Sequence, residues 1–263
     1  MHALILAAGQ GSRLAAEQPK CLVDIGGRPL LAHQMEAVRR AGAKRITIVV
    51  GHGHEAVQSF AEGEATFVHN HRFAETNSLY SFWLASEALA GDLLVLNCDV
   101  LFPGHVLQAL LEPDGSTLVF DSDSGDEEEH MKVRIREGRL VRMSKTLPPS
   151  RSDGENLGIL HLTEATAIAA FDAAAALVQQ GREQDWLGSA INAIAHDHQI
   201  SCVDVAGLPW VEIDFPHDLA SARTEIWPAI QALERRVRRP RVGSGFGWRP
   251  AIASFDAAEV AAG

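Results

Sequence analysis

A short apolar run near the start of the sequence ends in a glycine-rich turn. The run 3–6 leads into Gly9 and Gly11, and Arg13 and Lys20 follow shortly after. Glycines let backbone N–H groups approach phosphate oxygens, and two basic side chains add positive charge at the same place. The pattern predicts a buried strand that ends at a phosphate-binding turn. A simple connecting turn is the alternative, because the spacing fits neither a Walker loop nor a dinucleotide fingerprint.

The composition is that of an acidic globular chain. With 263 residues, 46% of them hydrophobic and 22% charged, the chain can bury the core of one ordinary domain. A net charge of −11 argues against general binding to nucleic acid or to anionic membranes. No apolar stretch has membrane-spanning length and no leader pattern comes first, so we expect a cytoplasmic location. The widely spaced Cys21, Cys98 and Cys202 predict small buried residues, not a zinc site or a disulfide.

Strand-like and helix-like segments alternate along the first hundred residues. We expect strands at 2–6, 45–50, 65–70 and 93–97, and helices at 30–41, 55–62 and 78–90. This alternation predicts an α/β fold with a Rossmann-like, mostly parallel sheet flanked by helices. Ligands bind beyond the carboxyl ends of the strands in such sheets, where Gly9 and Asp99 are both expected.

The second half of the chain changes character. We expect an acidic loop at 121–129, an inserted β-hairpin with strands at 131–136 and 139–144, and a further strand at 156–162. A helix capped by Thr163 is expected at 163–180, and a second helix at 184–197. A strand at 200–205 and a long last helix at 217–239 complete the expected elements. Residues 1–236 are interpreted as one domain. Residues 237–263, arginine-rich and then rich in small residues, are expected to form a flexible C-terminal extension.

Two acidic residues follow apolar strand-like segments. Asp99 comes after the run 93–97, and Asp214 ends the segment 210–214, in which acids alternate with apolar residues. A carboxylate at the buried end of a strand needs a positive partner, and Mg²⁺ shared with phosphate oxygens would supply it. Capping of the next helix is an alternative role for Asp214. Together with the phosphate-binding turn, the two residues favour a metal site.

These motifs resemble the signature of the nucleotidyltransferases that activate sugars and small phosphate esters. The segment 6–14 with Pro19-Lys20 matches the pattern L-A-A-G-x-G-x-R-L followed by P-K-x-L. The resemblance implies that Asp99 and Asp214 hold magnesium and that Arg13 and Lys20 act on the phosphates as catalytic residues. It also implies that the nucleoside triphosphate is wrapped by the turn residues Leu6, Ala7, Ala8, Gly9, Gly11 and Ser12.

Shorter motifs resemble the phosphocholine and phosphonate cytidylyltransferase branch of this family, over about residues 1–225. Asn77-Ser78 resembles the start of a helix near the base pocket, although Thr76 stands where many members carry a second Asn. Both residues, with Asp99, are therefore implied to bind the nucleotide. The hairpin region and the following strand resemble the acceptor side, with Lys132, Lys145, Glu155 and Asn156 as the implied binding residues.

The resemblance implies a Mg²⁺-dependent transferase that moves CMP from CTP, or from another nucleoside triphosphate, to a small phosphate or phosphonate with release of pyrophosphate. Phosphocholine and 2-aminoethylphosphonate are candidate acceptors. No nucleic-acid or membrane partner is expected, and a homodimer stays open. The alternatives are a sugar-1-phosphate uridylyl- or guanylyltransferase, and a non-catalytic nucleotide-binding regulatory subunit on the same fold.

Several residues have plainer interpretations. Lys132 and Lys145 suit an anionic acceptor but fit a solvated hairpin face equally well. The four histidines at positions 52, 54, 69 and 71 predict a loop beside the cleft, since a zinc enzyme would need carboxylate partners and an open position. Trp83, Trp186 and Trp210 are expected in the core instead of an aromatic cage for a quaternary ammonium.

Overall fold

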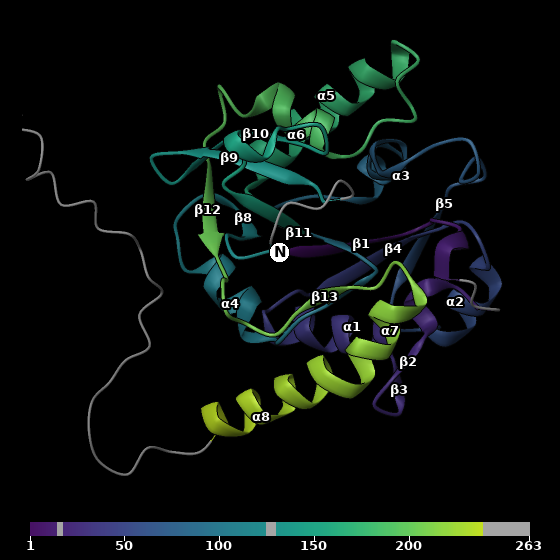
Figure 1. Cartoon of the computed structure of the whole chain (residues 1–263). Coiled ribbons are helices and arrows are strands. Elements are labelled where there is room, and N and C mark those ends of the chain that lie inside the picture. The colour runs from purple at the N-terminus through teal and green to yellow at the C-terminus, as the bar shows by residue number, and fades with distance from the viewer. Residues whose placement is uncertain (15–17, 125–129, 239–263) are drawn as a thin grey trace, which may run out of the picture.

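A large sheet forms the centre of the molecule, with helices packed on both of its faces (Figure 1). The computed structural model describes residues 1–14, 18–124 and 130–238. Within these residues the main sheet has nine strands. In spatial order they are β5 (Thr66–His69), β4 (Arg45–Val50), β1 (His2–Ala7), β6 (Leu93–Asn97), β11 (Gly154–Leu162), β8 (Ser116–Asp121), β12 (Ile200–Asp204), β10 (Arg139–Ser144) and β9 (Lys132–Arg136).

Strand directions divide this sheet into two halves. β5, β4, β1 and β6 run parallel, as expected for strands joined by helices. Beyond β6 the neighbours are antiparallel, except that β12 runs parallel to β8. The sheet is therefore mixed rather than mostly parallel. One reason is that β9 and β10 are joined by a two-residue connection, which only antiparallel strands allow.

Helices cover the two faces with separate apolar clusters. α1 (Leu30–Arg40), α2 (His54–Phe60) and α4 (His105–Leu111) contribute buried residues to one cluster. α3 (Ser78–Leu84), α5 (Glu164–Gln179) and α6 (Gly188–Ile194) contribute to the other. A sheet covered on both sides buries its central strands, which explains the apolar runs 3–7 in β1 and 93–96 in β6.

A third apolar cluster joins the C-terminal segment to the N-terminal turn. Leu14, Ile213 and Ile230 are buried together in this cluster. The segment contains α7 (Pro216–Ser221), a π-helical turn (Ala222–Ile226) and α8 (Trp227–Arg238), which lie below the sheet near β2 (Asp24–Ile25) and β3 (Arg28–Pro29) in Figure 1. The first and last parts of the described chain are therefore packed against each other.

Local sequence signals set several helix ends. The Thr163 hydroxyl accepts a hydrogen bond from the Thr166 amide at 3.4 Å and caps α5, as predicted. α1 ends where the Gly42 amide donates to Arg39 O and the Ala43 amide donates to Val38 O, each at 3.0 Å. These two bonds form a Schellman motif, which satisfies carbonyl groups left unpaired at the helix end.

The structure corrects the sequence prediction at several points. β8 and α4 were not predicted, and residue Asp121, expected in an acidic loop, is the buried last residue of β8. Its Oδ2 accepts a hydrogen bond from Trp210 Nε1 at 2.7 Å. Residues 125–129 of that loop and residues 239–263 of the C-terminal extension lie outside the described residues. No helix in the described ranges combines the length and apolar character needed to cross a membrane.

Three predicted helices are shorter or interrupted. The helix expected at 78–90 ends as α3 at Leu84 and is followed by a 3-10 turn (Ser86–Ala88). The helix expected at 184–197 is reduced to α6, because Glu183 O and Asp185 O accept hydrogen bonds from the amides of Asn77 and Leu79 at the start of α3. The helix expected at 217–239 is divided by the π-helical turn before Pro228, a residue that lacks the amide needed to continue an α-helical ladder. The expected strand 210–214 contains only β13 (Val211–Glu212), which lies outside the main sheet.

Candidate active site

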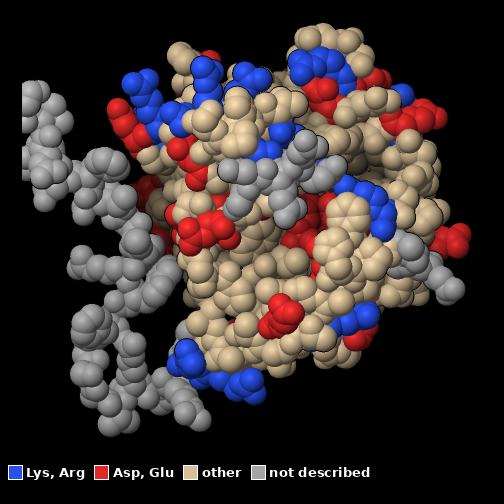
Figure 2. All heavy atoms as spheres, viewed as in Figure 1, with Lys and Arg blue, Asp and Glu red and all other residues tan. Residues whose placement is uncertain are grey.

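A cavity of about 400 Å³ opens beyond the carboxyl ends of β1 and β6. Figure 2 shows acidic and basic side chains close together in the central part of this face. The cavity brings together most of the predicted site residues, namely Leu6, Ala8, Gly9, Gly11, Ser12, Arg13, Lys20, Asn77, Ser78, Asp99, Lys145, Asn156 and Asp214. Ala7, Lys132 and Glu155 are absent from its lining, and each of them is buried.

The glycine-rich turn is shaped by close contact with Lys20. Gly11 has φ +60, and a Cβ atom at this position would lie 3.3 Å from the Cβ of Lys20. Glycine thus allows both the left-handed backbone and the approach of the lysine side chain. A 3-10 turn (Ser12–Leu14) follows, and its last residue, Leu14, anchors the loop in the third apolar cluster. Nothing lies within 4 Å of a Cβ placed on Gly9, so its backbone is open to a ligand.

A two-stranded ladder brings the distant acidic residues together. β7 (Val100–Leu101) pairs with β13, with Val100 opposite Glu212, and the Ile213 amide donates to Asp99 O at 2.9 Å. One carboxylate oxygen from each of Asp99, Glu212 and Asp214 lies within 4.8 Å of the others. Sequence reasoning missed Glu212 as a site residue. Its position two residues before Asp214 was the available signal, because side chains two apart in a strand share a face.

Lys20 and Arg13 neutralise part of this acidic cluster. Lys20 Nζ donates to Asp99 Oδ2 at 3.2 Å and forms a closer contact with Asp214 Oδ1. Arg13 Nη2 donates to Asp214 Oδ2 at 2.7 Å. The side chains of Lys20, Asp99 and Asp214 are only 12%, 19% and 15% exposed, so water screens these pairs incompletely.

The cluster shifts the pKa of its buried members. Burial lowers the pKa of the Lys20 amine, but the carboxylates of Asp99 and Asp214 outweigh that effect and raise the pKa above its ordinary value. Lys20 is therefore a permanent cation in this structure. Burial, followed by the charges of Asp99 and Asp214, raises the pKa of Glu212 to about 8.

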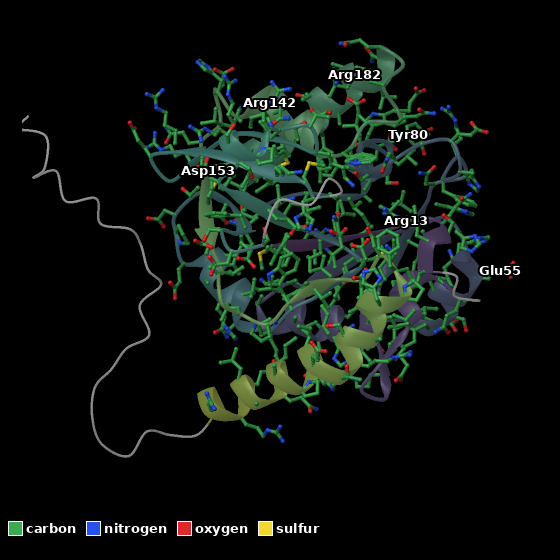
Figure 3. All side chains as sticks on the ribbon, viewed as in Figure 1. Arg13, Glu55, Tyr80, Arg142, Asp153 and Arg182 are labelled. Carbon is green, nitrogen blue, oxygen red and sulfur yellow. The ribbon has the colours of Figure 1, made fainter. Side chains whose placement is uncertain are left out.

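Asp214 does not cap the following helix. The N-cap residue of α7 is Phe215, and Asp218 in the first turn accepts hydrogen bonds at its Oδ2 from the amides of Asp214 and Phe215 at 2.9 Å and 2.7 Å. The carboxylate of Asp214 is left to face the two cations. Arg13 lies close to the start of α7 (Figure 3), with its guanidinium carbon 5.0 Å from the centroid of the Phe215 ring. The helix-cap interpretation of Asp214 is therefore wrong.

Asn77 and Ser78 form another part of the wall. The Asn77 side chain accepts a hydrogen bond from the Ser78 amide at 2.8 Å, and Ser78 Oγ accepts one from the Leu187 amide at 2.9 Å. Both side chains thus hold the start of α3 while lining the cavity. The buried Asn70 lines the cavity as well and donates to Thr76 Oγ1 and Ser81 Oγ at 3.0 Å and 3.1 Å. These interactions fix a polar wall that the sequence motif located only in part.

The predicted acceptor residues fall into two groups. Lys145 and Asn156 line the cavity, and Lys145 Nζ lies 5.0 Å from the centroid of the Trp186 ring, a cation–π contact. Lys132 is buried below them and donates to Lys145 O at 3.5 Å. Glu155 is also buried, with its Oε2 3.2 Å from His130 Nδ1. Only the first group is placed for direct contact with a ligand.

The remaining aromatic, histidine and cysteine residues take mostly structural positions. Trp186 lines the cavity, whereas Trp83 packs against Tyr80 with 5.2 Å between ring centroids. The His69 ring lies between those of His54 and His71 in tilted contacts, with centroids 4.2 Å and 3.9 Å apart. All three cysteines are free; Cys21 and Cys98 are buried and Cys202 is half-buried, close to the prediction.

Comparisons with known proteins show the family to which the chain belongs. Residues 3–242 match the model of the MobA-like NTP transferase domain. The chain is 30% identical over 247 residues to a CMP-5'-(3-aminopropyl)phosphonate synthase of Streptomyces rubellomurinus. The aligned region covers 84% of this chain and 38% of that protein. It is also 30% identical over 230 residues to a bifunctional IPC transferase and DIPP synthase of Aquifex aeolicus, covering 84% of this chain and 50% of the relative.

The chain thus spans half or less of the length of these two relatives. Among solved structures, the inositol-1-phosphate CTP transferase from T. maritima matches with a TM-score of 0.72 at 22% identity, covering 89% of this chain and 96% of that one. This match shows a shared fold. The family match extends over nearly the whole described chain and includes every residue of the acidic and basic cluster. The chain therefore belongs to the MobA-like NTP transferase family.

Proposed function

We propose that this protein transfers CMP from CTP to a small phosphate or phosphonate acceptor and releases pyrophosphate. One observation carries the proposal: an open glycine-rich turn, two basic residues and three carboxylates converge in a single cavity. The likeness to the Streptomyces CMP-5'-(3-aminopropyl)phosphonate synthase supports a cytidylyl group and a phosphonate acceptor. A nucleoside triphosphate and a phosphate-type acceptor are common to this activity and to the alternative sugar-1-phosphate transferases.

The acidic cluster fits a hard divalent cation such as Mg²⁺. Asp99, Glu212 and Asp214 offer carboxylate oxygens, which Mg²⁺ prefers. In addition, Asp99 Oδ1 is buried and has no hydrogen-bond partner among the described residues, a costly state that a bound cation would relieve. We assign these three residues as the metal ligands. A bound Mg²⁺ would withdraw charge from the α-phosphate and help to orient both reactants.

The protein residues then act by positioning and by charge. An oxygen of the acceptor phosphate forms a new bond to the α-phosphorus, and the bond to the β-bridging oxygen breaks with its electron pair leaving on pyrophosphate. An anionic phosphate oxygen is already a nucleophile, so no general base is required. Backbone amides of the glycine-rich turn bind the triphosphate, and Arg13 and Lys20 stabilise the charge that develops on it.

We assign the acceptor to the part of the cavity that is lined by Lys145, Asn156 and Trp186. Lys145 and Asn156 lie there beside Trp186, and they supply one cation and one amide for a phosphate or phosphonate group. Asn77 and Ser78 form part of the wall that faces the nucleoside. Lys132 and Glu155 support this part from beneath and do not bind the acceptor directly.

Pyrophosphate release tests the proposal directly. Purified protein is incubated with Mg²⁺, one of the four common nucleoside triphosphates, and phosphocholine, 2-aminoethylphosphonate, inositol phosphate or a sugar 1-phosphate. We expect release with CTP and a non-sugar acceptor. Preference for UTP or GTP with a sugar phosphate would point to the alternative transferases. Tight nucleotide binding without turnover on any acceptor would indicate a regulatory subunit.

A further inference from the structure

The amine of Lys20 lies where it competes with a metal ion for the acidic cluster. It contacts both Asp99 and Asp214, two of the three carboxylates assigned to the metal. Arg13 engages the other oxygen of Asp214 at 2.7 Å. The charged carboxylates of Asp99 and Asp214 repel each other at this distance, and in the ligand-free protein these two side chains offset the repulsion. A divalent cation must therefore displace an existing counter-ion before it gains the full attraction of the site.

The same lysine lies against the phosphate-binding turn. The side chain of Lys20 packs on Gly11, whose Cβ position would be 3.3 Å from the Cβ of the lysine. The turn and the carboxylates line one cavity. A lysine side chain has several rotatable bonds and a compact charged end, so a change of rotamer is enough to move its charge between neighbouring anions.

We propose that Lys20 is an exchangeable counter-ion that holds the carboxylates before substrates bind and moves to the triphosphate when a divalent cation replaces it. This inference rests on the proposed function. Metal alone binds weakly because it competes with Lys20. Nucleotide alone binds weakly because drawing Lys20 away leaves the acids uncompensated. Each ligand removes the obstacle to the other, so the two bind cooperatively, and by linkage the coupling is equal in both directions.

Metal affinity without nucleotide provides the test. Mn²⁺ serves as the probe, and its free concentration is followed by electron paramagnetic resonance during titration of the full chain. Lys20→Met removes the charge and keeps an unbranched side chain, so we expect Mn²⁺ to bind at least about tenfold more tightly than to wild type. Lys20→Arg keeps the charge and should bind Mn²⁺ as wild type does. Lys44→Met removes an exposed lysine far from the site and controls for net charge.

A Lys20→Met variant that binds Mn²⁺ no more tightly than wild type would overturn the proposal, as would equal tightening in Lys20→Arg. Circular dichroism verifies that each variant is folded. If Lys20→Met does not fold, wild type is titrated with Mn²⁺ at zero and at saturating CTP, and with CTP at zero and saturating Mn²⁺, using free ligand concentrations. We expect at least about fivefold coupling, equal in both directions; independent binding would refute it. Failure of the proposed function would appear separately, as absent pyrophosphate release.

Discussion

The carboxylate of Asp218 supports the backbone from which Asp214 projects, and its removal has a measurable cost. Its Oδ2 accepts hydrogen bonds from the amides of Asp214 and Phe215 at the start of α7. Asp218→Ala leaves both amides without that acceptor. Loss of a helix cap typically costs about 0.5–2 kcal/mol, and with two amides affected we expect about 1–2 kcal/mol of unfolding free energy to be lost.

The same change should slow catalysis, because one of the two amides belongs to Asp214 itself. A shift of this backbone moves the Asp214 carboxylate relative to Lys20 and Arg13. If about 1–2 kcal/mol of positioning is also lost in the transition state, kcat falls by about 5- to 30-fold. Asp218→Asn keeps a carbonyl oxygen as an acceptor and should lie between the wild type and the alanine variant in both measurements.

Urea unfolding followed by circular dichroism gives the stability, and pyrophosphate release gives the rate. Asp172→Ala is the matched control, because Asp172 is exposed on α5; its unfolding free energy should stay within about 0.5 kcal/mol of wild type. Unchanged stability of Asp218→Ala would show that the two hydrogen bonds contribute nothing. Lower stability with an unchanged kcat would show that Asp218 supports the helix alone and does not position Asp214.

Three further predictions concern the metal site, a tight contact and the acid limit of stability. Asp99→Asn should abolish Mg²⁺-dependent turnover while Asp172→Asn keeps it; full activity of the first variant in a Mg²⁺ titration would exclude Asp99 as a ligand. Gly158→Ala should lower the unfolding free energy, measured in urea, by more than Gly181→Ala does. Both glycines have a left-handed backbone, which costs alanine about 1–2 kcal/mol. Only at position 158 would the added Cβ also meet another atom, Asn97 Nδ2, at 2.4 Å. Burial, the largest cause in each case, lowers the pKa of His2, His33 and His161, so the unfolded chain binds protons first as the pH falls below about 6.5. Glu212, whose pKa is raised to about 8, contributes the opposite slope in this range, so the histidine effect is measured as the difference between wild type and a His2→Asn variant. From pH 7.5 to 5.5 the unfolding free energy of wild type should change less favourably than that of His2→Asn, because the variant no longer has a group that the unfolded chain protonates first. Parallel profiles of the two proteins would contradict the prediction.

The parallel half of the fold was predictable because its signals are local. Apolar strands, amphipathic helices and their stop residues repeat in regular order from β1 to β6, and short crossovers leave few alternative arrangements. The second half resisted prediction because tertiary contacts decide it. The amides of Asn77 and Leu79, for example, take the carbonyls of Glu183 and Asp185 and shorten the helix expected at 184–197. Local propensity contains no information about such a partner.

The candidate site shows the same division. The N-terminal motif located Arg13 and Lys20, and the strand ends located Asp99 and Asp214, all of which line one cavity. Glu212 was missed, because the small β7–β13 ladder that places it beside the other acids joins segments far apart in sequence. Lys132 and Glu155 were misplaced by one step of strand alternation, which turns a side chain from the cavity toward the interior.

That ladder also determines when the site can form during synthesis. The ribosome releases the glycine-rich turn and Asp99 long before residues 211–214, and chains usually begin to fold from the N-terminal end. A nascent chain can therefore build the parallel half of the sheet while two of the three acids proposed to bind the metal are not yet synthesised. The proposed metal site is incomplete until β13 docks onto β7. The protein should acquire cation affinity late, in one step, as the last quarter of the chain packs into place.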